Sequence, residues 1–410
     1  MKNSRQFARG PAFGRSNSAR STLFHGANIS DAAEHNKRII LQVIRANGRI
    51  ARKHIAEILG LTPPTVFNIT NELAASGLII PAARTSGERG KPTTFWMINP
   101  DGVYSLGLAV DRDHLTLVLL DFAGQVRHRY HQEIAFADPQ MTREFAADCI
   151  EDLLQHAPEF LSRLVGFGVA LPDDLDKTHL PGQPDSYSNW SNMTGEALIE
   201  GLIDVPIWVE NDAAAAALGE MYFGGGLESD SFFYILISAG LGGGLVVNRH
   251  YHRGAHGRSG EIGFLPQVNP FRPRFNHLDK TLGDAVLLTD LFQRLHAEGH
   301  RAILPEDLLD LNPSGQACID EWISSISDYL YLPLLNILYA IDPDAFYVGG
   351  RLPAPILARL CTEISKRLSI SVGTDWPRPL VRPASLAKDA SAIGAAVLAV
   401  QLYWSQARPG

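Results

Sequence analysis

The residues best suited to ligand chemistry are three consecutive polar side chains, Glu210, Asn211 and Asp212. A short strand is predicted to end at Glu210, and an alanine-rich helix is predicted to begin directly after it. Asn211 and Asp212 therefore lie where open α/β folds bind ligands, at a strand's carboxyl end and a helix N-terminus. A carboxylate there can accept a hydroxyl proton, as the base of a sugar-phosphorylating enzyme does. The alternative, that these side chains only cap the helix for about 1 kcal/mol, stays open.

A further acid, Glu261, is bracketed by Gly260 and Gly263. It is a second candidate for ligand contact. The alternative is an ordinary solvated turn, and this short motif does not distinguish the two.

A helix-turn-helix pattern occurs within the first hundred residues. Apolar stripes at helical spacing over 39–44 and 55–59 predict two helices, and Gly60 stands where the second should end. Thr62 can cap a third helix, whose first turn accepts Pro63. The polar outer face of that helix suits DNA, because an asparagine amide can pair with adenine in the major groove. The residues predicted to face DNA on this third helix are Thr62, Thr65, Phe67, Asn68 and Asn71.

A predicted β-hairpin follows the third helix, with strands over 78–80 and 94–98. Its tip carries Arg89 and Lys91 around a glycine, which makes it narrow and cationic. Such a wing suits insertion into a minor groove. Three short helices alone would also fit a structural bundle, and the wing together with the charge favours DNA binding.

The remaining residues predict an α/β fold. Strands over 104–110 and 115–121 enclose the turn Asp111 to His114. A similar unit follows about 125 residues later, with strands over 232–238 and 244–248 around a turn over 239–243. The two units resemble one motif used twice, which predicts two lobes that face a cleft. A helix over about 142–155 and a buried strand over 164–171 lie between them.

The charge is divided unevenly along the chain. The 410 residues carry a formal net charge of -8, but residues 1–99 hold 14 basic and 5 acidic residues, a net +9, which leaves 22 basic and 39 acidic residues, a net -17, for the rest. A polyanionic partner should therefore meet the first hundred residues. Residues 1–34 are expected to form a disordered basic tail.

Cysteine usage and hydropathy indicate the compartment. Cys149, Cys318 and Cys361 are too far apart for a disulfide framework or a close-spaced metal cluster. A reducing cytoplasm is the simplest setting. No stretch reaches the roughly 20 apolar residues that a spanning helix needs, so no membrane partner is expected.

Taken together, these residues resemble the ROK family of repressors, open reading frames and sugar kinases. The segments that carry the resemblance, in chain order, are Thr62 to Val66, Arg89 to Pro92, Asn189-Trp190, Glu210 to Ala213, Gly260 to Gly263, Ile341 to Pro343, Val348 to Gly350 and Ala392 to Ala395. The resemblance implies an N-terminal winged helix-turn-helix and a two-lobed, actin-like and sugar-kinase-like (ribonuclease H-like) α/β domain. It implies that a sugar would contact Asn189, Asn211, Asp212, Glu261 and, through a looser alignment, Asp279.

Departures from the family pattern argue against catalysis. Family kinases have a glycine-rich first turn whose N–H groups approach phosphate, whereas this chain has Asp111 to His114, with a second carboxylate that would repel ATP. The second turn has Ser238-Ala239 where kinases tend to have Gly-Thr. The family's zinc site is expected to be absent, because Phe264 replaces its histidine and no cysteine lies between Cys149 and Cys318.

The expected protein is a cytoplasmic, non-enzymatic transcriptional regulator without a cofactor, a repressor of carbohydrate-metabolism genes. It should be a homodimer or homotetramer, bind a palindromic operator and respond to a sugar or sugar derivative. The alternatives are an active ATP-dependent ROK sugar kinase with an attached DNA-binding domain, and a regulator with a vestigial cleft controlled by a protein partner. The expected divisions are a tail over 1–34, a winged helix over 35–99, a first lobe over 100–212 completed by 390–408, and a second lobe over 213–389.

Overall fold

The structure is a computed structural model that describes residues 29–82, 93–173, 175, 183–370 and 377–406. Its described residues separate into two compact units, which join through the segments around residues 76–81 and 97–98. The smaller unit contains the helix-turn-helix pattern, and the larger one contains the α/β fold. Each unit is described by itself.

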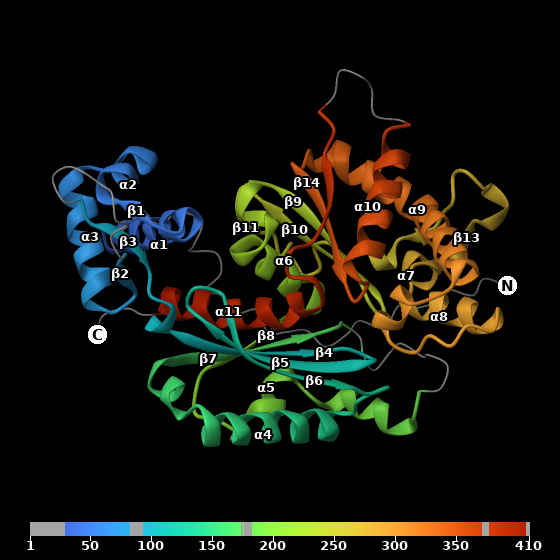
Figure 1. Cartoon of the computed structure of the whole chain (residues 1–410), viewed down its shortest axis with the longest axis horizontal. Helices are drawn as coiled ribbons and strands as arrows, with labels where there is room; N and C mark the ends of the chain where they lie inside the picture. The colour runs from blue at the N-terminus through green and yellow to red at the C-terminus, as the bar shows by residue number, and fades with distance from the viewer. Residues whose placement is uncertain (1–28, 83–92, 174, 176–182, 371–376, 407–410) are drawn as a thin grey trace, which may run out of the picture. The chain divides into compact units, whose positions relative to one another are not determined.

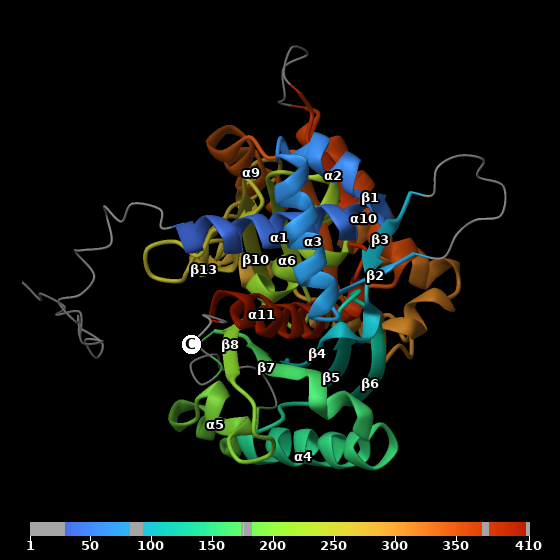
Figure 2. The ribbon, with the colours of Figure 1, turned by 90° about the vertical axis from the view of Figure 1, so that its left-hand side faces the viewer.

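The smaller unit consists of three helices and a small sheet with strand order β1-β3-β2 (Figure 2). Its elements are α1 (Ile29–Asn47), β1 (Ile50–Ala51), α2 (Arg52–Leu59), α3 (Pro63–Ala75), β2 (Ile79–Pro81) and β3 (Phe95–Ile98). Helix α1 begins within the segment expected to be a disordered tail up to residue 34. Residues 31–38 are rich in alanine and charged helix formers but lack an apolar stripe, which is why periodicity does not detect this first turn.

The predicted helix boundaries of this unit have a local physical basis. Gly60 ends α2 in the left-handed conformation, with φ of 63°, and donates its N–H to the Ala56 carbonyl. Thr62 Oγ1 lies 3.4 Å from the Thr65 amide at the start of α3 and accepts its hydrogen bond. Both observations confirm the caps predicted from the sequence.

The larger unit contains two five-stranded sheets with the same design, in strand orders β6-β5-β4-β7-β8 and β11-β10-β9-β14-β15. In each sheet a three-stranded antiparallel meander is followed by two parallel strands. The repeated strand order matches the repetition of the strand–turn–strand motif in the sequence.

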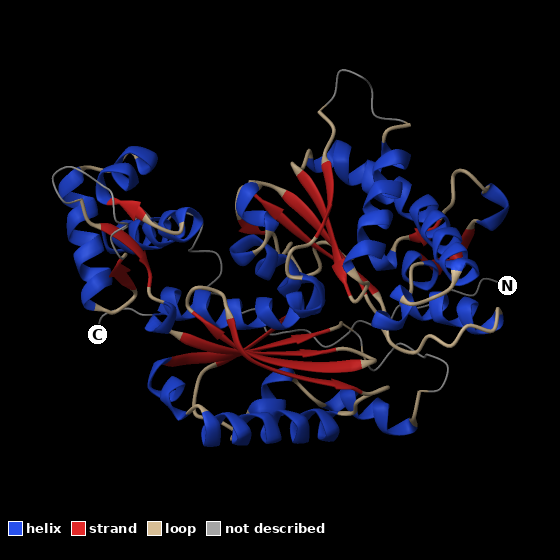
Figure 3. Ribbon diagram, viewed as in Figure 1, coloured by secondary structure: helices blue, strands red, loops and turns tan. Residues whose placement is uncertain are grey.

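We call the first sheet with its covering helices the first lobe. Its elements are β4 (Tyr104–Val110), β5 (His114–Asp121), β6 (Val126–Glu133), α4 (Pro139–His156), β7 (Leu164–Leu171), α5 (Gly195–Ile199), β8 (Ile207–Asn211) and α11 (Ala390–Gln406). Helices α4 and α5 lie on one face of the sheet, and α11 lies on the other (Figures 1 and 3).

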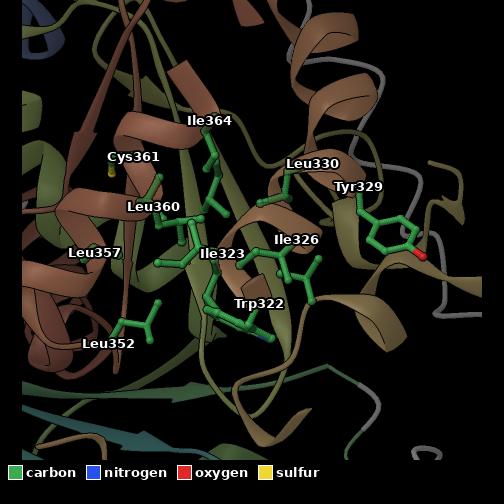
Figure 4. Close-up of a cluster of buried hydrophobic side chains, with 14 of the residues drawn as sticks. Trp322, Ile323, Ile326, Tyr329, Leu330, Leu352, Leu357, Leu360, Cys361 and Ile364 are labelled. Atoms are coloured by element: carbon green, nitrogen blue, oxygen red, sulfur yellow. The ribbon is translucent and has the colours of Figure 1, made fainter. Parts of the chain in front are cut away.

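We call the second sheet with its helices the second lobe. Its elements are α6 (Asp212–Phe223), β9 (Phe232–Ile237), β10 (Leu241–Val247), β11 (His250–Tyr251), β12 (Pro266–Gln267), β13 (His277–Thr281), α7 (Leu282–Ala285), α8 (Leu288–Ala297), α9 (Pro313–Ile341), β14 (Ala345–Gly350), α10 (Ala354–Leu368) and β15 (Leu380–Pro383). Its largest apolar core lies between the sheet, α9 and α10, and includes the fully buried Trp322 and Leu360 (Figure 4).

Helices α6 and α11 pack against each other between the two sheets. The fit depends on small residues, because a Cβ atom on Gly394 would lie 1.6 Å from the Ala215 carbonyl oxygen. Gly168 in β7 is equally constrained, since its Cβ would lie 1.8 Å from the Ala395 oxygen. The alanine-rich sequence of α6 is therefore a packing requirement, and it fixes the position of Asp212 at the first turn of the helix.

The second hairpin turn is shorter than the sequence predicts. Strand β10 already begins at Leu241, so Gly242, Gly243 and Gly244 lie within the strand. A Cβ atom on Gly242 would meet the Ala213 side chain, and one on Gly244 would meet the Ala217 side chain, both on α6. A Cβ atom on Gly243 would meet the Gly260 carbonyl oxygen and the Phe233 ring. These glycines therefore permit close packing, and only Gly240 remains in the turn.

Candidate functional site

Asn211, Asp212 and Glu261 line one pocket at the junction of the two lobes, with a volume of about 160 Å³. Asn211 is the last residue of β8 and Asp212 the first of α6, while Glu261 lies on the loop after β11. The structure thus brings together three of the five residues expected to contact a sugar. Asp173 and Arg112, which sequence reasoning did not select, line the same pocket.

Asn211 also has the structural role that was left open. Its Oδ1 accepts hydrogen bonds from the amides of Ala213 at 3.0 Å and Ala214 at 3.1 Å, so Asn211 caps α6. The carboxyl group of Asp212 is removed from water, and burial together with the nearby charge of Asp111 raises its pKa to about 7. Asp212 can therefore exchange a proton near neutral pH.

Glu261 forms a carboxyl pair with Asp173. Burial, the hydrogen bond to Asp173 and its negative charge raise the pKa of Glu261 to about 8. Two carboxyl groups that hydrogen-bond to each other share a proton, so the pair can both donate to and accept from a ligand hydroxyl. Asp173 follows β7 directly, and its place at the carboxyl end of a parallel strand is the signal that could have identified it.

A larger cavity of about 420 Å³ shares Pro172, Asp173 and Asn211 with this pocket. Leu171, Trp190 and Met193 supply an apolar wall. Its polar lining includes Glu210, whose Oε2 lies 3.3 Å from Arg253 Nη2; burial raises the pKa of Glu210, and the Arg253 charge opposes that shift. A cavity of this size with an aromatic wall and clustered polar groups is typical of small-molecule sites.

The two other residues expected to contact a sugar are Asn189 and Asp279, and Asn189 is not among the described residues that line the smaller pocket. Asn189 is on the 3₁₀ helix η5 (Asp185–Asn192) with an exposed side chain, and its neighbour Trp190 lines the larger cavity. Asp279 lies on β13, and its side chain is outside the described residues. Phe264, at the position of the family's histidine, is 56% exposed at the edge of the smaller pocket.

The first hairpin turn is bonded to the second lobe. Ser238 Oγ donates to Asp111 Oδ2 at 2.6 Å, and Arg351 Nη1 donates to Asp113 Oδ2 at 2.6 Å. Arg351 also donates to Glu133. A small cavity of about 20 Å³ adjoins these bonds and is lined in part by Asp111, Ser238 and Arg351.

The backbone amides of this turn also have partners. The Asp111 amide donates to the His114 carbonyl at 3.0 Å, and the Arg112 amide donates to Asp111 Oδ1 at 2.7 Å. His114 Nδ1 lies 2.7 Å from Asp113 Oδ1. Two amides of the turn thus donate within the turn itself. Asp113, the second carboxylate of the turn, bonds to Arg351 and His114.

Helix α3 buries one face and exposes the other. Val66, Ile69 and Leu73 are buried, whereas the side chains expected to face DNA are partly or fully exposed. Among them, Phe67 is 50% exposed, and the hydroxyl oxygens of Thr62 and Thr65 lie 2.8 Å apart. The wing residues Arg89 and Lys91 lie outside the described residues.

Arg52 orders this face and was not selected from the sequence. Its Nε donates to Thr70 Oγ1 at 2.6 Å, and its Nη2 donates to Asn71 Oδ1 at 2.5 Å. Its guanidinium carbon lies 4.6 Å from the centroid of Phe67 and 4.8 Å from that of Trp96. Arg52 thereby joins α2, α3 and β3.

These features define a class of protein, in which a winged helix-turn-helix DNA-binding unit is joined to a two-lobed, sugar-kinase-like domain. A model described as the ROK family matches residues 105–402, and one described as winged helix-turn-helix DNA-binding matches residues 34–80. The chain belongs to the ROK family. Both the family and the fold class expected from the sequence are confirmed.

Similar curated proteins include regulators of related length. The xylose repressor of Bacillus spizizenii is 25% identical over 372 residues, covering 90% of this chain and 95% of that protein. The DNA-binding transcriptional dual regulator NagC of Escherichia coli is 23% identical over 339 residues, covering 79% of this chain and 82% of that protein.

Solved structures show the same fold. A ROK family transcriptional regulator, a homolog of the E. coli MLC protein, has a TM-score of 0.65 at 21% identity and covers 91% of this chain and 97% of its own. A ROK family glucokinase from Streptomyces griseus, in complex with glucose and AMPPNP, has a TM-score of 0.51 at 22% identity and covers 73% of this chain and 99% of its own. The glucokinase structure thus aligns with about three quarters of this chain, whereas the regulator structure aligns with most of it.

Two features bear on the expected compartment, the state of the cysteines and the apolar character of the helices. Cys149, Cys318 and Cys361 are buried and have free thiols. Among the described residues, no helix has the length and apolar character required to cross a bilayer.

Proposed function

We propose that this protein is a sugar-responsive transcriptional repressor whose ROK domain binds a sugar or sugar derivative without phosphorylating it. One combination of features carries the proposal. The chain has a DNA-binding unit and a pocket lined by Asn211, Asp212 and Glu261, and the first hairpin turn beside that pocket is bonded to the second lobe. The repressor names of relatives that align over most of the chain support the same reading.

Within the pocket, Asn211, Asp212 and Glu261 would bond ligand hydroxyls. Asn189 and Asp279 remain proposed contacts from the family resemblance, and Asp173 joins the set because it bonds to Glu261. On the DNA side, the exposed face of α3 and the tip residues Arg89 and Lys91 would contact the operator. A homodimer or homotetramer with two-fold symmetry would require a palindromic operator.

The geometry of the first turn supports the proposed loss of kinase activity. Phosphoryl transfer depends on donors that hold the transferred group and neutralise its charge. Here the Asp111 and Arg112 amides already donate within the turn, and both Asp111 and Asp113 are bonded to side chains of the second lobe. ATP and zinc are therefore not expected as cofactors, and the buried thiols fit the expected cytoplasmic setting.

An active sugar kinase with an attached DNA-binding unit is the second candidate. It is favoured by the pKa of Asp212, raised to about 7, which suits a general base. An ADP-release assay over a panel of sugars separates the two functions, because robust turnover would contradict our proposal.

Genome-wide footprinting of bound DNA tests the regulatory function directly. We expect discrete palindromic sites beside carbohydrate-metabolism genes, and those genes would indicate the sugars to assay. Sites that are released by a sugar in vitro would support the proposal. Uniform, sequence-independent coverage of the genome would contradict it.

A further inference from the structure

The side chain of Arg112 lies in the smaller pocket between the two hairpins. It lines that pocket together with Asp212, Ser238 and Gly240. Its Nη1 is so close to the second turn that a Cβ atom on Gly240 would lie 2.9 Å from it. The Arg112 guanidinium thus lies beside the second hairpin turn.

The Arg112 side chain has a buried donor without an acceptor. Its Nε is buried without a hydrogen-bond partner, and no side-chain hydrogen bond or ion pair joins Arg112 to any of the described residues. Arginine offers five donors in a planar fork, and leaving buried donors unsatisfied costs free energy. An arrangement of this kind is explained if an acceptor arrives with a ligand.

The acids of the same turn are not available to supply that acceptor. The side chain of Asp111 accepts from Ser238 and from the Arg112 backbone, and Asp113 bonds to Arg351 and His114. The carboxylates next to Arg112 are thus turned toward other donors. Among the pocket acids, Asp212 interacts electrostatically with Arg112. Asp212 is the first residue of α6, and its Oδ1 already accepts from the Ala213 amide.

The geometry points to an anionic sugar as the effector, with its phosphoryl or carboxylate group held by the Arg112 guanidinium and its hydroxyls by Asn211, Asp212 and Glu261. This inference rests on the proposed sugar-binding function and names the ligand class. Arginine forks match the planar or tetrahedral oxygens of both anions, so sugar phosphates and sugar acids share the required chemistry.

The size and charge of the site agree with such a ligand. The pocket of about 160 Å³ adjoins the cavity of about 420 Å³ at their shared lining residues, and together they have room for a monosaccharide with one charged substituent. The raised pKa values of Asp212, about 7, and Glu261, about 8, leave part of their population protonated near neutral pH, which reduces repulsion of an anion.

The test is calorimetry with glucose, glucose 6-phosphate, glucuronate and their five-carbon equivalents, together with inorganic phosphate alone. Wild-type protein is expected to bind at least one phosphorylated or acidic sugar at least tenfold more tightly than the neutral sugar of the same skeleton. Preference for the phosphate or for the carboxylate identifies the source of the anion, and either result supports the inference. Inorganic phosphate should bind weakly and compete with the preferred ligand.

Two variants locate the binding at Arg112. Arg112→Gln should weaken the anionic sugar by about 10- to 100-fold, the loss expected for a charged hydrogen bond, and change neutral-sugar binding by less than threefold. Gly240→Ala, which displaces the guanidinium without removing its charge, should cause a smaller loss in the same direction. Arg382→Gln is the matched control, because Arg382 is an exposed arginine on β15 that pairs with Glu228.

Three results would overturn the inference. The first is unchanged affinity of Arg112→Gln for the anionic sugar, with an unfolding midpoint that shows the variant is folded. The second is tighter binding of neutral sugars, with sugar-dependent release of DNA; this refutes the ligand class and leaves the proposed function intact. The third is an absence of binding and DNA release with every sugar, which refutes both.

Discussion

Arg52 provides the sharpest test of how the DNA-reading face is built. Replacing it by methionine keeps most of the apolar stem and removes the guanidinium that bonds Thr70 and Asn71. The same change removes the cation from between Phe67 and Trp96. Arg52→Met should therefore loosen α3 against α2 and β3, and release the Asn71 amide from its present orientation.

The magnitude follows from these contacts. Two hydrogen bonds from a charged, half-exposed donor contribute about 1 kcal/mol each. The two cation–π contacts contribute about 0.5–1 kcal/mol each at such a site. Because neighbouring contacts are not additive, we expect the free energy of unfolding of this unit to fall by about 2–3 kcal/mol. Arg52→Lys keeps the charge without the planar fork and should give an intermediate loss.

The assay compares Arg52→Met with Lys53→Met, which removes one positive charge from the next position of α2. Lys53 is a suitable control because its side chain is 82% exposed and its nearest acid, Glu57, is 3.7 Å away. A duplex selected from a random pool by the wild type serves as the DNA ligand. Arg52→Met should lower affinity for that duplex by at least tenfold and reduce its advantage over random DNA. If urea unfolding and DNA affinity match those of Lys53→Met, the reasoning is refuted.

Three further predictions concern other parts of the chain. Asp212→Asn should keep DNA binding and lose sugar-dependent release in a fluorescence anisotropy titration; unaltered release would contradict its ligand role. Arg89→Ala should weaken operator binding and reduce the slope of log affinity against log salt by about 1, and an unchanged slope would exclude the wing contact. Burial opposes and Asp113 favours the charged form of His114, with a net rise in its pKa from 6.5. Its stabilisation is therefore complete below pH 6.5 and is lost as pH rises through the raised pKa, so His114→Gln should flatten the unfolding-midpoint profile above pH 6.5; a profile identical to wild type would argue against this.

Local patterns in the sequence were sufficient for much of the fold. Strands β4 and β7 have the predicted bounds, because continuous apolar runs between turn residues describe buried strands. The buried positions of α3 also follow from helical periodicity. The short strand β1 was missed, since two residues offer no periodicity and its pairing with β3 is set by the tertiary structure.

The site was less predictable because its contacts are distant in sequence. The sequence shows that the first turn lacks glycine, but Asp113 is bonded to Arg351, which lies 238 residues further along the chain. The effect of the Asp113 carboxylate on this turn therefore depends on a tertiary contact that the sequence does not show. Arg52 and Arg112 are single arginines that belong to no sequence motif. Only the structure shows that Arg52 contacts two aromatic rings and that Arg112 lines a pocket.

The connection between the lobes determines how they can move. The chain crosses between them at the Asn211–Asp212 junction and again between β15 and α11. Two bodies joined at two points retain chiefly one rotation, about the line through those points. Asp212 lies at one of these points, so a ligand bound there is close to the axis. The displacement caused by a rotation grows with distance from its axis. A rotation too small to disturb the ligand's own hydrogen bonds would therefore still shift the residues at the far end of each lobe by a larger distance.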